Sequence, residues 1–277
     1  MGRCAPHPEV VNRLPSILIV GYGHVGQQIG KLFTAAAYMD VNDAMRWVSG
    51  DNPVIDPGPE QVLHFDLGFI AVPTPEGPGG RCDVSIVRQA YGRWKGWARY
   101  WCIKSTVEVG TTESLGSNVC FSPEFYGETV GHPLADPANQ TFVILGGPPE
   151  VTRAFATAWT LATNSYTRIH QTDARTAELC KLMENSWIAT KVSFCNQFYD
   201  LAALAGVDWH ELRELWLADP RVSRSHTYVY KSNRGFGGAC IPKDTAGLCA
   251  WARERGMPAE LIEAVRAYNR GLREVQS

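Results

Sequence analysis

A glycine-rich stretch around residue 240 carries the residues best suited to covalent chemistry. Residues 235–245 read GFGGACIPKDT, with three glycines in four positions shortly before Cys240. Glycines lack the Cβ atom that keeps backbone and ligand apart, and a neighbouring Lys243 in a turn fixed by Pro242 would lower the pKa of the thiol. Asp244 adds a possible acid or base. A glycine-rich turn with a buried cysteine is the plainer alternative, and this stretch alone leaves both open.

A long helix is predicted to bring a second polar group to the thiol. The chain has no Pro or Gly from Asp173 to about Ala205, which allows one helix of about 33 residues and about 50 Å. Lys181 and Asn185 are four residues apart and therefore lie on one face. A solvated stripe is the ordinary interpretation, whereas a buried cation and amide could bind an oxyanion. Apolar residues occupy several faces of this helix, which predicts burial by both halves of the chain and by the second subunit of a homodimer.

Near the N-terminus, an apolar strand at Ser16 to Val20 runs into a glycine motif and a helical pattern. In such a motif the first glycine permits the turn, the second lets a pyrophosphate approach the backbone, and the third allows close packing of helix on strand. The amides of the helix's first turn then hold the phosphates. This predicts a dinucleotide site formed by Gly21, Tyr22, Gly23, His24, Val25 and Gly26.

Asp40 follows Gly21 at close to the spacing of about 20 residues expected of the acid that binds the adenosine ribose. Its carboxylate would repel a 2′-phosphate, so the sequence favours NAD over NADP. The neighbouring residues are rich in turn formers, and a plain turn residue is the alternative interpretation of Asp40.

Further apolar strands are predicted at residues 67–72, 100–103, 118–121, 141–146 and 166–169, with helical segments among them. This pattern predicts an α/β fold with a Rossmann-type doubly wound parallel sheet, followed by an all-helical central domain with one long connecting helix. Ligands bind beyond the carboxyl ends of the strands in such sheets. We therefore expect Thr74, Thr106, Glu124 and Glu128 to converge there, although each alone could be a helix cap.

Composition sets the remaining limits. The 277 residues suffice for two domains, at 1–170 and 171–277, and the net charge of −2 without blocks of like charge argues against nucleic acid or a membrane surface as partner. The expected partner is a small molecule. The eight cysteines show no CxxC spacing, which indicates reduced thiols in a cytoplasmic protein and no metal site.

Taken together, these motifs resemble the UDP-glucose/GDP-mannose dehydrogenase family, whose members oxidise the C6 alcohol of a nucleotide sugar to a carboxylate with two NAD. The likeness rests on residues 21–26, 104–111, 122–128, 181–185 and 219–221, and above all on 235–244. It implies that Cys240 is the nucleophile, that Lys181 and Asn185 hold the oxyanion, and that Asp244 and Thr106 order a water. The other implied roles are hydrolysis for Glu128, contact with NAD for Lys243, Thr74 and Thr106, substrate binding for Glu124, Phe125, Lys181, Asn185 and Gly237, and reaching the neighbouring subunit's site for Arg221.

The sequence also departs from the family. Members usually continue into a second Rossmann-like domain that binds the nucleotide of the sugar, whereas this sequence stops at Ser277, so a short form is expected and the substrate stays open. A thiohemiacetal and thioester route would give a four-electron oxidation. The alternatives are a two-electron 3-hydroxyacid-type dehydrogenase, which needs no cysteine, and a catalytically silent NAD-binding or dimerisation module.

Overall fold

The computed structural model describes residues 15–33, 36–40, 46–47, 64–125 and 137–275. Within these residues the first half of the chain forms one eight-stranded sheet of order β3-β2-β1-β4-β5-β6-β7-β8. Its strands are β1 (Ile17–Val20), β2 (Ala36–Met39), β3 (Arg46–Trp47), β4 (Phe65–Ile70), β5 (Ala98–Ile103), β6 (Val119–Phe121), β7 (Phe142–Gly146) and β8 (Arg168–Thr172).

Strands β2, β1, β4, β5 and β6 are parallel, as the sequence predicts. Two joins nearer the edges are antiparallel, at β2–β3 and β6–β7, so the sheet is mixed rather than purely parallel. Antiparallel strands at the margin of a mainly parallel sheet are common in doubly wound folds. The chain order reverses between β1 and β4, which places a topological switch point beside the glycine motif.

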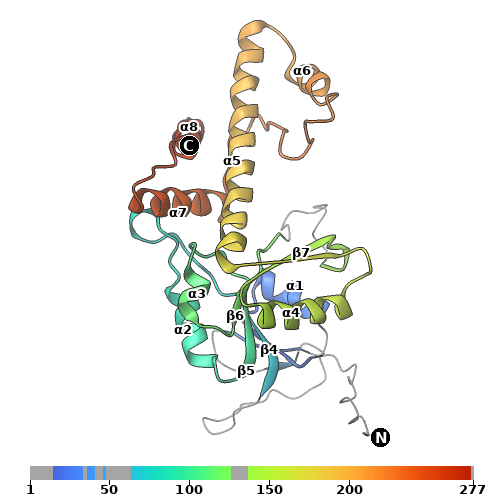
Figure 1. Cartoon of the computed structure of the whole chain (residues 1–277). Coiled ribbons are helices and arrows are strands. Elements are labelled where there is room, and N and C mark those ends of the chain that lie inside the picture. Colours follow the sequence, from blue (N-terminus) through green and yellow to red (C-terminus); the bar gives the residue numbers. More distant parts are fainter. Residues whose placement is uncertain (1–14, 34–35, 41–45, 48–63, 126–136, 276–277) are drawn as a thin grey trace, which may run out of the picture.

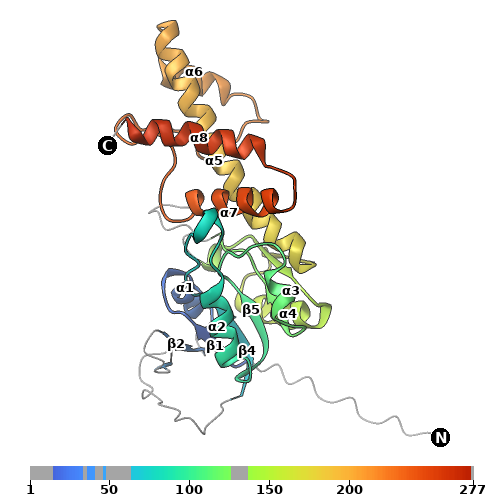
Figure 2. The same ribbon diagram turned by 90° about the vertical axis from the view of Figure 1, so that its left-hand side faces the viewer.

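Helices cover both faces of the sheet (Figures 1 and 2). Successive residues of β1 point to opposite faces: Leu18 packs in the cluster on the side of α2 (Ser85–Trp94), and Ile19 packs in the cluster on the side of α1 (His24–Leu32) and α4 (Pro149–Ala162). Strands buried on both faces must be apolar almost throughout, which is why they read as short continuous apolar runs.

The second half is helical and is built on α5 (Ala174–Ala205), the long helix that the sequence predicts. Asp173 caps its start by accepting a hydrogen bond from the amide of Thr176, and Gly206 ends it with a φ of 70°. Figure 1 shows α5 rising from the sheet, with α6 (Trp209–Trp216) near its far end. Beside the lower half of α5 lie α7 (Ile241–Glu254) and α8 (Glu260–Glu274), and both pack on it.

Short elements join the two halves. The turn η1 (Pro78–Gly80) packs on α7, and α3 (Thr111–Leu115) packs on α5. A second short turn, η2 (Pro137–Asn139), contacts α1 within the sheet half. Arg81, just after η1, forms ion pairs with Glu108 of the sheet half at 2.8 Å and with Glu254 of α7 at 3.1 Å. No helix in the described ranges is both long enough and apolar enough to cross a membrane.

Candidate active site

The three motif glycines occupy three different environments. Gly21 has a φ of +90°, and a Cβ there would lie 2.7 Å from the carbonyl oxygen of Ala71; a Cβ on Gly26 would lie 2.1 Å from the carbonyl oxygen of Gly21. Gly23 directly precedes α1, and a Cβ on it would meet nothing within 4 Å. The first and third glycines are thus required by the packing, while the second faces open space at a helix N-terminus, where a pyrophosphate fits.

The other cofactor candidates surround this turn. Tyr22 stacks on Tyr38 of β2 with ring centroids 3.6 Å apart, His24 is exposed, and Val25 is half-buried. Asp40 follows the last residue of β2 and is exposed. Since β1 and β2 are adjacent parallel strands, their carboxyl ends place Asp40 on the same edge of the sheet as the glycine turn.

Cys240 lies directly before the first residue of α7 and is exposed. Its carbonyl oxygen accepts the first backbone hydrogen bond of that helix, from the amide of Asp244 at 2.9 Å. The positive end of a helix dipole stabilises a thiolate, so this position favours the nucleophilic form of the thiol.

A continuous line of hydrogen bonds runs from α5 through the start of α7 to the sheet. Lys181 Nζ donates to Asn185 Oδ1 at 3.4 Å, and Asn185 Nδ2 donates to Asp244 Oδ2 at 2.5 Å. Lys243 Nζ donates to Asp244 Oδ1 at 2.6 Å and lies 3.5 Å from the hydroxyl of Thr74. Asn185 and Asp244 are 5% and 2% exposed. The pair on α5 is therefore not a solvated stripe, because the amide of Asn185 is buried against the carboxylate of Asp244.

Burial lowers the pKa of Lys181, and the charges of Asp244, Glu124 and Cys240 oppose that shift. Its ammonium also lies 5.0 Å from the ring centroid of Phe125. The ammonium of Lys243, which the sequence predicts beside the thiol, is paired with Asp244 at 2.6 Å, and the charge of Cys240 also acts on Lys181.

The loops after β4, β5 and β6 supply the remaining neighbours. Thr74 is buried, and the half-buried Thr106 accepts a hydrogen bond from the thiol of Cys82 on its carbonyl oxygen at 3.3 Å. Glu124 is buried beside Lys104, with Nζ and Oε2 3.5 Å apart. Of the four residues expected to converge beyond the strand ends, Thr74 lies 3.5 Å from Lys243 Nζ, and the charge of Glu124 acts on Lys181 of α5.

The remaining residues predicted for the site are Gly237, Arg221 and Glu128. Gly237 lies in the loop before Cys240, where a Cβ would be 2.3 Å from the guanidinium of Arg273. The side chain of Arg221 is exposed and paired with Asp219 at 2.5 Å. Glu128 lies outside the described residues.

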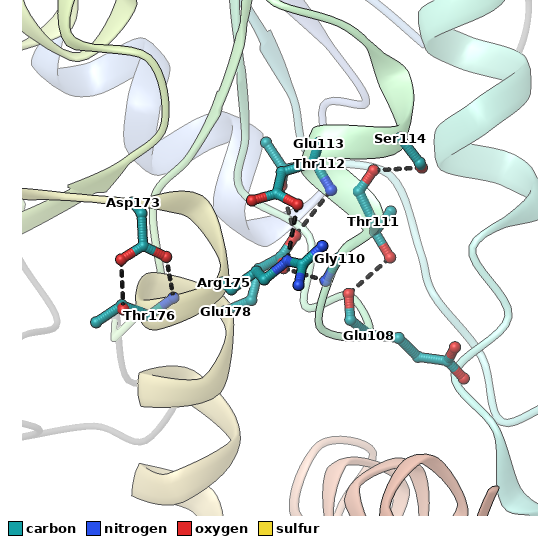
Figure 3. A network of polar contacts seen from close by, with 10 residues as sticks. All are labelled: Glu108, Gly110, Thr111, Thr112, Glu113, Ser114, Asp173, Arg175, Thr176 and Glu178. Atoms are coloured by element: carbon teal, nitrogen blue, oxygen red, sulfur yellow. Dashed lines mark hydrogen bonds and ion pairs between the residues drawn. The ribbon is translucent and has the colours of Figure 1, made fainter. Parts of the chain in front are cut away.

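Sequence reasoning gave no role to Glu178, which is 0% exposed and joins the two halves of the chain. Figure 3 shows its carboxylate at the start of α3, where it accepts hydrogen bonds from the amide of Gly110 at 2.5 Å and from the amide and hydroxyl of Thr112 at 2.8 and 2.6 Å. No local pattern predicts this contact, since its partners lie more than sixty positions away. The carboxylate docks α3 on α5 close to the candidate site.

The fold and the site together define a Rossmann-type protein with a cysteine, lysine and asparagine assembled where its helical half meets the sheet. Residues 175–271 match the UDP-glucose/GDP-mannose dehydrogenase family, central domain. The chain is also similar to curated UDP-glucose 6-dehydrogenases over more than nine tenths of its length, which confirms the resemblance seen in the motifs.

Two relatives and two solved structures show the extent of the likeness. The chain is 29% identical to the UDP-glucose 6-dehydrogenase of Pseudomonas aeruginosa, over 94% of this chain and 66% of that protein. It is 27% identical to the UDP-glucose 6-dehydrogenase TuaD of Bacillus subtilis, over 92% and 63%. It therefore spans slightly less than two thirds of the length of these relatives.

Among solved structures, a UDP-glucose dehydrogenase from Pyrobaculum islandicum superimposes with a TM-score of 0.80 at 26% identity, over 96% of this chain and 70% of that one. The 3-hydroxyisobutyrate dehydrogenase of Mycobacterium tuberculosis superimposes with a TM-score of 0.69 at 18% identity, over 92% and 93%. The latter likeness concerns the fold alone.

Proposed function

We propose that this chain is an NAD-dependent oxidoreductase of the nucleotide-sugar 6-dehydrogenase type, which oxidises a primary alcohol to a carboxylate in two steps. The observation that carries the proposal is the hydrogen-bonded line from Lys181 through Asn185 to Asp244, beside a thiol at the start of α7. The names of the relatives support a nucleotide sugar as substrate.

NAD, when bound, accepts one hydride from the substrate carbon in each of the two oxidations. The glycine turn and the first turn of α1 would hold its pyrophosphate, Asp40 its ribose, and Thr74, Thr106 and Lys243 would contact it near the thiol. Lys243 is held for this purpose by Asp244, which limits the positions that its ammonium can take.

Cys240 performs the covalent step. After the alcohol has lost a hydride and its hydroxyl proton, the thiolate adds to the aldehyde carbon and forms a thiohemiacetal. A second hydride leaves that carbon to NAD as the hydroxyl of the thiohemiacetal loses its proton, and water then cleaves the resulting thioester to the acid and regenerates the thiol. The bond to sulfur keeps a reactive aldehyde in the site between the two oxidations.

Lys181 and Asn185 stabilise the negative oxygen at each tetrahedral stage, because an ammonium and an amide N–H are donors aimed from one helix face. Asp244 and Thr106 orient the water, and Glu128 assists its attack. Glu124, Phe125 and Gly237 line the substrate, and Arg221 serves the second subunit's site.

A two-electron 3-hydroxyacid-type dehydrogenase is the second candidate, since the glycine turn, the long helix α5 and the lysine at position 181 would also serve that reaction. That reaction has no use for a thiol, whereas here the thiol stands at the start of α7 within electrostatic reach of Lys181. The position of Cys240 therefore favours the four-electron reaction over the two-electron one.

The stoichiometry of NADH tests the covalent step. With a substrate found in a panel of nucleotide sugars, we expect two NADH per molecule of acid, and Cys240→Ser should stop after the first oxidation because an alkoxide is a poorer leaving group than a thiolate. Cys180→Ser, at a half-buried position on α5, is the control and should keep both oxidations. Two NADH per turnover from Cys240→Ser would exclude covalent catalysis.

Cofactor choice tests Asp40. Calorimetric titration should show tighter binding of NAD than of NADP, since the carboxylate repels a 2′-phosphate, and Asp40→Ala should narrow the difference by about tenfold or more, or about 1.4 kcal/mol. Asp66→Ala, which removes a carboxylate that accepts hydrogen bonds from the amide and hydroxyl of Ser16, is the matched control and should leave the preference for NAD unchanged. NADP binding as tight as NAD in the wild type would remove Asp40 from this role.

We also propose that two copies pair along α5. Large apolar side chains stay at least partly exposed at regular helical spacing on this helix, although Trp216 of α6 packs against Phe194. They are Leu179, Met183, Trp187, Phe194, Phe198 and Leu201. A stripe this long on a straight helix suits an identical helix from a second subunit. The proposal keeps the domain division at 1–170 and 171–277, and the cytoplasm as the compartment expected from the cysteines.

A further inference from the structure

The loop that leads to Cys240 is held by two buried asparagines from different helices. Asn269 of α8 accepts a hydrogen bond from the amide of Phe236 at 2.7 Å and donates one to the carbonyl oxygen of the same residue at 2.9 Å. Asn196 of α5 accepts from the preceding amide, of Gly235, at 3.3 Å and from Arg234 Nε at 2.6 Å. Two consecutive peptide units are thereby fixed from two sides.

The loop sequence fits this arrangement. Gly235 has a φ of +77°, and a Cβ on it would lie 2.4 Å from Asn269 Oδ1. A side chain at that position would therefore be strained and would displace the amide of Asn269. The close approach of Asn269 is therefore enough to explain a glycine at position 235, without a bound ligand.

Apolar packing connects Phe236, whose peptide Asn269 holds, to the residue that follows Cys240. The ring of Phe236 is buried with Ala189 of α5 and Val265 of α8, and Ile241 packs against the same cluster. Ile241 is the first residue of α7 and follows Cys240 directly. Cys240 therefore sits between two anchors, the peptide held by Asn269 and the side chain of Ile241, that share one apolar cluster.

We propose that Asn269 is the positioning residue of the thiol loop: its carboxamide fixes the peptide at Phe236 and so holds Cys240 at the start of α7. The inference rests on the proposed function only in taking Cys240 as the nucleophile. Asn269 does not touch the thiol, and it acts through Phe236 and Ile241.

The chemistry of the amide supplies a specific test. Asn269 offers one acceptor and one donor to the same residue, and a carboxylate at this position would set a second acceptor against the carbonyl oxygen of Phe236. A protonated carboxyl group again has one acceptor and one donor. Asn269→Asp should therefore lose the hydrogen bond to the carbonyl oxygen of Phe236 at neutral pH and regain it when the new acid is protonated. Asn269→Ala cannot form this hydrogen bond at any pH.

Other ionisable groups face this loop and keep their charge in the variants. Arg234 pairs with Asp200 at 2.9 Å and donates to Asn196, and Arg273 donates to Asn233 and to the carbonyl oxygen of Arg234. The two guanidinium groups favour a charged carboxylate at position 269, while the carbonyl oxygen of Phe236 favours its protonated form.

The measurement is the rate at which a dipyridyl disulfide, which reacts at acidic pH, modifies Cys240 in the full-length protein, located by mass spectrometry. A held thiol next to Lys181 and the helix N-terminus has more thiolate than a mobile one, so both variants should react about threefold slower or more at pH 7.5. As the pH falls from 8 to 4.5, the ratio of variant to wild-type rate should rise toward one for Asn269→Asp and should not rise for Asn269→Ala.

Asn118→Asp is the matched control. The side chain of Asn118, which lies in the sheet half, also accepts through Oδ1, from the hydroxyl of Tyr91, and donates through Nδ2, to the carbonyl oxygen of Arg99. It should match the wild type throughout. If Asn269→Ala does not fold by circular dichroism, Asn269→Gln, with both groups moved by one methylene, takes its place.

Equal rates for wild type and both variants at every pH would overturn the inference, as would a parallel rise of the ratio in the alanine or glutamine variant. The thiol measurement needs neither NAD nor substrate. Failure to oxidise any nucleotide sugar would thus remove the proposed function and leave the test of Asn269 intact.

Discussion

At the scale of single residues, the environment of Lys181 decides what it can do. Burial lowers its pKa, the charges of Asp244, Glu124 and Cys240 oppose that shift, and the charged form lies in a setting where water screens it little. A cation of this kind interacts more strongly with a developing oxyanion than an exposed lysine would.

The lowered pKa of Lys181 predicts an alkaline limit on activity below the ordinary lysine value of 10.5. Only the charged form stabilises the oxyanion, so kcat should fall as the pH rises through the pKa of the folded protein. Lys181→Ala should lower kcat by about 100-fold or more, and Lys181→Arg should move the alkaline limit upward. The exposed Lys95 is the control position, where Lys95→Ala should leave the pH profile unchanged.

The contribution of Lys181 to the free energy of unfolding should rise with pH, whereas kcat falls. A lysine whose pKa is lower folded than unfolded binds its proton less tightly in the folded state, so its contribution to the free energy of unfolding rises with pH between the two values. Denaturant titrations across the alkaline range would measure this. A wild-type profile that Lys181→Arg does not alter would show that another group sets the limit.

At the scale of elements, the docking of α3 on α5 depends on one buried carboxylate. Glu178→Gln keeps an acceptor for Thr112 but points an amide N–H at the amide of Gly110, so a buried donor loses its partner. We expect the free energy of unfolding to fall by about 1–3 kcal/mol, measured by denaturant titration.

Glu184→Gln, at an exposed position on the same helix, is the matched control and should change stability by less than about 0.5 kcal/mol. Burial raises the pKa of Glu178, whereas three hydrogen bonds lower it. Equal losses in both variants would mean that helix α5, rather than the contact with α3, responds to the exchange.

At the scale of the molecule, the exposed stripe on α5 predicts a dimer of about 61 kDa, twice the 30.6 kDa of one chain. Met183, the most exposed member of the stripe, is 70% exposed in the single chain. Met183→Glu would place a charge in the proposed interface, and light scattering at micromolar concentration should then find a monomer. Leu161→Glu, an exposed apolar residue on α4, should stay dimeric. A monomeric wild type would contradict the proposal.

The sequence by itself determined whatever depends on local periodicity and on single backbone positions. The length of α5 follows from the absence of Pro and Gly, and the shared face of Lys181 and Asn185 follows from 3.6 residues per turn. The positive φ of Gly21 and the tight packing of Gly26 follow from the glycine motif because only a residue without Cβ fits there. These features involve neighbours in the chain.

Only the tertiary structure decided which distant groups meet. Asn185 reaches Asp244 across 59 positions and Lys243 reaches Thr74 across 169, because α7 crosses α5 at the edge of the sheet. The packing of separate elements also brought Lys181 within electrostatic range of Cys240, and it gave Glu178 and Asn269 partners that no spacing in the sequence predicts. Hydrogen bonds between separate elements depend on how those elements pack, and packing is set by the whole core.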